Sequence, residues 1–159
     1  MKKIDLGQTI TILANTGVIA SLIFLGMQVR LEAAASRAAT FQQLKSSWVQ
    51  ANLAEATSVD LAKAFVSAET QGWDNTGPVE RRLLSGYIRT LFHNWSNAYY
   101  HYEDGTLDEN QWQASVREMR SGMSNPLLRQ VWSEWGFVFD DRFGDLMKDV
   151  LAESEAETN

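Results

Sequence analysis

The stretch ITILANTGVIASLIFLGMQV, from Ile10 to Val29, contains no charged residue over 20 consecutive positions. A helix needs about 20 apolar residues to cross the hydrocarbon core of a bilayer, which is about 30 Å thick. Charged residues stand on both sides, with Lys2, Lys3 and Asp5 before the stretch and Arg30 and Glu32 after it. The sequence therefore predicts a single transmembrane helix, with residues 1–31 as an N-terminal membrane anchor.

Two alternatives compete with a transmembrane helix for this stretch. Lys2 and Lys3 would suit the start of a cleaved signal peptide, and Ala33-x-Ala35 resembles a cleavage site. However, the apolar run is longer than the usual core of a signal peptide, and charged residues intrude before the site. A buried core helix or an interfacial helix is the other alternative, although 20 uncharged residues at the N-terminus are unusual for either.

Small and polar residues within the anchor are grouped on two faces of the predicted helix. At 100° per residue one face holds Asn15 and Gly26, and the other holds Ala14, Gly17, Ser21 and Gln28. Small residues spaced four apart let helices approach closely in lipid, and amide side chains exchange hydrogen bonds between helices. We expect these six residues to pack against a partner helix, either in a second copy of the chain or in another membrane protein, although small and polar residues are also common in spans that pair with nothing.

After the anchor, apolar spacing predicts helices and no strands. The anchor helix is expected to continue to about Asn52 with Phe41, Leu44 and Trp48 on one face, because the segment lacks Gly and Pro. The other predicted helices are Val59–Glu69, capped by Ser58; Pro78–Glu103, with the stripe Leu84, Ile88, Leu91, Trp95, Tyr99 and Tyr102; one after a Thr106-x-x-Glu109 capping box, burying Trp112, Val116, Met119 and Met123; one opened by Asn125-Pro126; and about Asp141–Ala152.

These elements predict an all-α chain, in which the transmembrane helix runs into an antiparallel bundle of about five helices. The bundle domain is expected to span residues 32–153. Residues 154–159 are acidic and are expected to form a disordered tail.

Composition excludes several classes of function. The net charge is −6, and no basic run follows Lys3, so we expect no nucleic-acid partner. The chain has no cysteine and only two histidines, His93 and His101, which lie eight residues apart. On one helix that separation is about 12 Å, too far for both to bind one ion, so we expect no metal and no cofactor.

Several motifs are similar to those of an uncharacterised family of small bacterial proteins. They are GVIASLIFL at residues 17–25, Gln28-Val29-Arg30, Asn97-Ala-Tyr-Tyr100 with Tyr102, Gly105-x-Leu107-Asp108 with Trp112, and the aromatic stretch from Trp132 to Phe143. The resemblance implies a single-span anchor followed by a helical domain, and it carries no known activity. We expect the cytoplasmic (inner) membrane as the location, and Arg30, Arg37 and Lys45 against Lys2 and Lys3 favour a cytoplasmic bundle.

The most polar and aromatic face lies on the predicted helix Pro78–Glu103. It carries Arg89, His93, Asn97, Tyr100 and His101, which are either a face for a ligand or partner or simply the solvated side of the helix. No nucleophile with an orienting group is apparent, so we predict a non-enzymatic, membrane-anchored interaction protein, acting as a self-associating scaffold or an accessory subunit of a membrane complex. The alternatives are a small-ligand sensor with a pocket near Arg89, His93, Asn97 and Tyr100, or an enzyme with an acid/base site on the same face.

Overall fold

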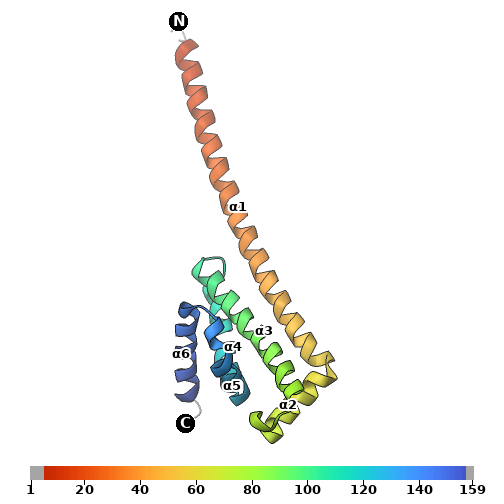
Figure 1. The fold of residues 1–159 in the computed structure, drawn as a ribbon. Helices are drawn as coiled ribbons and strands as arrows, with labels where there is room; N and C mark the ends of the chain where they lie inside the picture. The colour runs from red at the N-terminus through yellow and green to blue at the C-terminus, as the bar shows by residue number, and fades with distance from the viewer. Residues whose placement is uncertain (1–5, 157–159) are drawn as a thin grey trace. The chain divides into compact units, whose positions relative to one another are not determined.

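The computed structural model describes the backbone of residues 6–156 and the side chains of residue 7 and residues 10–156. The predicted anchor flanks Lys2, Lys3 and Asp5, and the tail residues 157–159, lie outside this range. Within it the chain forms six α-helices and two 3₁₀ turns, and no strand. They are α1 (Leu6–Thr57), α2 (Val59–Gln71), η1 (Trp73–Asn75), α3 (Pro78–Glu103), α4 (Glu109–Met123), α5 (Pro126–Trp135), η2 (Gly136–Val138) and α6 (Asp141–Ala156). The predicted all-α class is confirmed (Figure 1).

The chain divides into two units, residues 1–39 and residues 40–159. The described part of the first unit is a single helix, in which every side chain from Ile10 to Ala39 is exposed. Its apolar window has the length and composition to cross a membrane, and none of that window is buried. Within the described residues this helix therefore buries no face of the kind that a core helix would bury.

The second unit begins within α1, which continues without a break as predicted. Thr40, Leu44 and Ala51 are buried, and Phe41 and Trp48 pack against the core. These residues recur at spacings of three, four and seven, so they form the apolar face that the sequence indicates for this segment.

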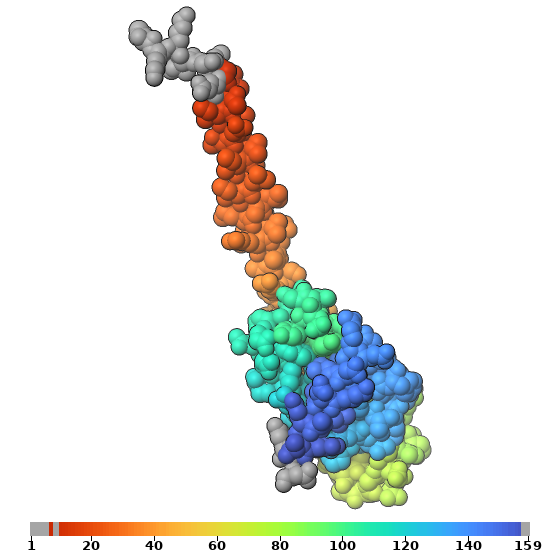
Figure 2. All heavy atoms as spheres, turned by 90° about the vertical axis from the view of Figure 1, so that its left-hand side faces the viewer, coloured from red at the N-terminus to blue at the C-terminus, as the bar shows by residue number. Residues whose placement is uncertain are grey.

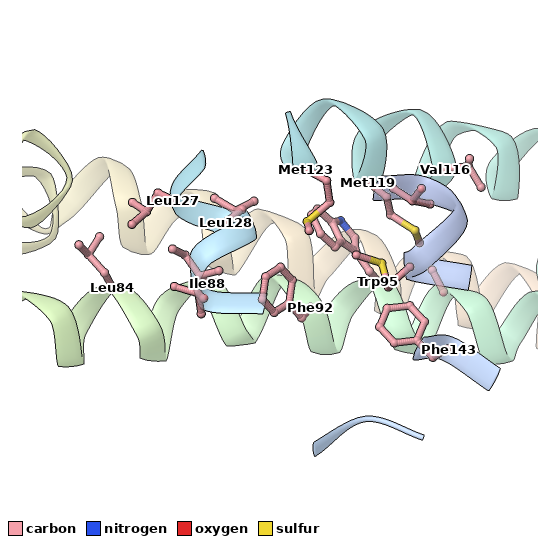
Figure 3. Packing of buried hydrophobic residues seen from close by; sticks show 14 of the residues in the cluster. Leu84, Ile88, Phe92, Trp95, Val116, Met119, Met123, Leu127, Leu128 and Phe143 are labelled. Carbon is pink, nitrogen blue, oxygen red and sulfur yellow. The ribbon is translucent and has the colours of Figure 1, made fainter. Parts of the chain in front are cut away.

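The core of the bundle is built on α3. Leu84, Ile88, Phe92 and Trp95 project from α3 and meet side chains of α4, α5 and α6 (Figure 3). Those opposing side chains are Val116, Met119, Met123, Leu127, Leu128 and Phe143. The contacts bury large aromatic side chains from several helices, and such burial is the main favourable term in folding.

One position of the predicted α3 stripe is wrong. Phe92, and not Leu91, is fully buried, and its ring contacts Trp95, Trp132 and Phe139 at centroid distances of 5.5, 5.2 and 6.3 Å. Neighbouring helical positions differ by 100°, so either residue fits a broad stripe. Trp132 on α5 and Phe139 after η2 lie on the side of α3 that Phe92 faces, so Phe92 is the residue that becomes buried.

The predicted caps of α2 and α5 are confirmed. Ser58 accepts a hydrogen bond from the Leu61 backbone N–H, and Asn125 accepts one from that of Leu127. The predicted Thr106-x-x-Glu109 capping box is wrong by two residues, because Asp108 and Gln111 form the box that opens α4. Asp is a strong N-cap residue, and placing the cap at 108 leaves Leu107 free to be buried.

The last helix is longer than predicted. α6 extends to Ala156, so residues 154–156 belong to the helix and not to the expected disordered tail. Ser154 is buried, and its hydroxyl accepts a hydrogen bond from the Arg129 guanidinium, which also pairs with Glu155 at 3.4 Å. These contacts to α5 hold the last turn. Figure 2 shows α4, α5 and α6 meeting in a continuous surface on this face.

Candidate functional site

The hydroxyl groups of the anchor helix are satisfied within the helix itself. Thr11, Thr16 and Ser21 donate to the carbonyl oxygens of Gly7, Ile12 and Gly17, each four residues earlier, at 2.8–3.0 Å. A back-bonded hydroxyl needs no second partner and so adds little polarity to the helix surface. These three residues can therefore face lipid.

Asn15 and Gln28 differ from those hydroxyl residues. Within the described residues neither amide side chain makes a hydrogen bond, and both are exposed. Gly17 and Gly26 have nothing within 4 Å of the position that a Cβ would occupy. The six predicted packing residues thus combine amides that lack partners with small positions that are open to close approach.

The polar face predicted on α3 is engaged mainly with neighbouring aromatic residues. The Arg89 guanidinium carbon lies 4.1 Å from the centroid of the Trp135 ring, a cation–π contact, and the His93 ring lies 4.8 Å from that of Phe139. Arg89 therefore packs against the end of α5, and His93 packs against the segment that joins α5 to α6.

The remaining residues of that face are divided among separate contacts. Arg142 lies over the Tyr100 ring at 5.2 Å, and burial together with the nearby Asp140 carboxylate raises the pKa of Tyr100 to about 12. His101 Nδ1 is 3.0 Å from the Thr106 hydroxyl, and Asn97 is exposed. The five residues share one helix but do not converge on a common point.

A concavity of the bundle lies between residues 40–57 of α1, α2 and α3. It is an open groove with a volume of about 1380 Å³. Small and apolar side chains dominate its lining, including Ala51, Ala54, Leu61, Leu83 and Gly86. None of the five residues of the predicted α3 face lines it.

Two polar side chains stand out in the groove. The Tyr87 hydroxyl donates a 2.6 Å hydrogen bond to Glu55 Oε2. Burial, and then the Glu55 carboxylate, raise the pKa of Tyr87 well above its usual range. Asn94 is only 7% exposed, and among the described residues its Nδ2 has no hydrogen-bond partner. A buried amide without a partner is costly, so Asn94 marks a position where an acceptor from outside would be favourable.

The groove was not anticipated, although the sequence contains a signal for it. Gly86, Thr90 and Asn94 follow each other at intervals of four on α3. Glycine inside a helix costs about 1 kcal/mol relative to alanine, so a mid-helix glycine often indicates a close approach by something else.

Among the described residues, no group of three or more His, Asp or Glu side chains is arranged to hold a metal ion. Comparisons with protein-family models, curated proteins and solved structures find no match for this chain.

Proposed function

We propose that this protein is a membrane-anchored, non-enzymatic interaction protein that self-associates through its N-terminal helix. The observation that carries the proposal is the contrast within that helix between hydroxyls bonded to their own backbone and the Asn15 and Gln28 amides, which lack such bonds. In lipid an amide without a partner is unfavourable, and a second helix supplies the missing donor and acceptor.

Small residues beside these amides support the same proposal. Gly26 lies on the face of Asn15, and Gly17 and Ser21 lie on the face of Gln28. The side-chain positions of both glycines are empty, so a second backbone can approach on either face. When a second copy of the same helix packs on the Asn15 face, each Asn15 amide can donate a hydrogen bond to the other and accept one from it. A helix of a different membrane protein is the other form of the proposal, with this chain as an accessory subunit.

The membrane in question is proposed to be the cytoplasmic membrane of a bacterium, crossed once, with the bundle on the cytoplasmic side. The resemblance to small bacterial single-span proteins supports the location. The balance of Arg30, Arg37 and Lys45 after the span against Lys2 and Lys3 before it supports the orientation.

The test is the association constant of the full chain in mild detergent, measured by sedimentation equilibrium. Asn15→Leu is expected to weaken dimer formation roughly 5- to 30-fold, as expected for losing a hydrogen bond of about 1–2 kcal/mol between helices in an apolar medium. Gly26→Leu is expected to weaken it as well, because Gly26 shares the face of Asn15 and a large side chain there prevents close approach.

Thr16→Leu is the matched control, since it also replaces a polar residue by leucine. Thr16 lies on a different face, 100° from Asn15, and its hydroxyl is bonded to the Ile12 carbonyl. The control is expected to leave the dimer unchanged. Equal dimer constants for wild type, Asn15→Leu and Gly26→Leu would sink the proposal.

A further inference from the structure

We draw no further inference here: the strongest candidate, the open groove between residues 40–57 of α1, α2 and α3 with the buried Asn94 in its lining, carries nothing because no contact among the described residues shows what covers it.

Discussion

Residues 6–39 and residues 40–156 are both almost entirely helical, but their helices are stabilised in different ways. In the first region every side chain from Ile10 onwards is exposed, and the side-chain hydrogen bonds of the described residues 10–39 return to the helix's own backbone. In the second, 20 apolar side chains form one buried cluster. The first helix is therefore specified by composition and length, and the second region by which residue occupies which face.

The largest expected difference between the regions follows the loss of a large apolar side chain. Phe92→Ala is expected to lower the free energy of unfolding of the bundle by about 3–5 kcal/mol, because Phe92 is fully buried among other rings. Leu22→Ala, at a position 63% exposed in the anchor, is expected to leave it unchanged.

Tryptophan fluorescence during urea unfolding in detergent measures this difference. All six tryptophans lie between Trp48 and Trp135, so the signal reports on the bundle alone. A comparable loss of stability in both variants would mean that the anchor helix contributes to the core, against the division into two units.

A smaller effect is expected when a methyl group is added to a glycine in each region. In Gly122→Ala the new Cβ would lie 2.7 Å from Trp95 Cη2 and 2.8 Å from Cζ2, and Trp95 is only 2% exposed. Overpacking of this kind is expected to cost about 1–3 kcal/mol, more than the gain from replacing glycine in a helix.

Gly17→Ala is the counterpart in the anchor, where nothing lies within 4 Å of the Cβ position. The unfolding midpoint of the bundle is expected to be unchanged in this variant. If Gly122→Ala unfolds at the same midpoint as the wild type, α4 can move away from Trp95 without a loss of stability.

The two regions also differ in what the sequence predicts about them. For the anchor, the run without charge predicts the helix, and nothing in the pattern depends on an exact residue. For the bundle, periodicity and caps place each helix within a few residues, but they cannot choose between Leu91 and Phe92, which lie 100° apart on the same broad stripe. That choice is made by Trp132 and Phe139, which are distant in the sequence.

Long-range contacts also explain the remaining differences. The last turn of α6 was expected to be disordered because it is acidic, but Arg129 on α5 holds Ser154 and Glu155. The groove was not predicted because it depends on how residues 40–57 of α1 pack beside α3. The polar face of α3 was visible in the sequence, but its aromatic partners Trp135 and Phe139 were not.

The smallest expected effect concerns pH, and it again separates the two regions. The pKa of Tyr87 is raised in the folded protein by burial and then by the Glu55 carboxylate. A raised pKa means that the folded state holds the proton more tightly than the unfolded one, whose value is near 10. The resulting stabilisation is fully present below pH 10 and is lost as the pH rises above 10. All four tyrosines lie in the bundle, so the anchor lacks this dependence.

Tyr87→Phe is expected to lower the stability of the bundle at pH 7 slightly, because the 2.6 Å hydrogen bond to Glu55 is lost, and to make the decline between pH 10 and 11.5 shallower. Glu55→Gln is expected to reduce that decline less than Tyr87→Phe does, because burial is the largest cause of the shift and remains in place. The measurement is the urea midpoint, followed by tryptophan fluorescence at each pH. If the urea midpoint falls equally with pH in wild type and Tyr87→Phe, the pH dependence comes from Tyr99, Tyr100 and Tyr102, whose pKa values are also raised. The Tyr87–Glu55 contact between α3 and α1 would then make no contribution to it.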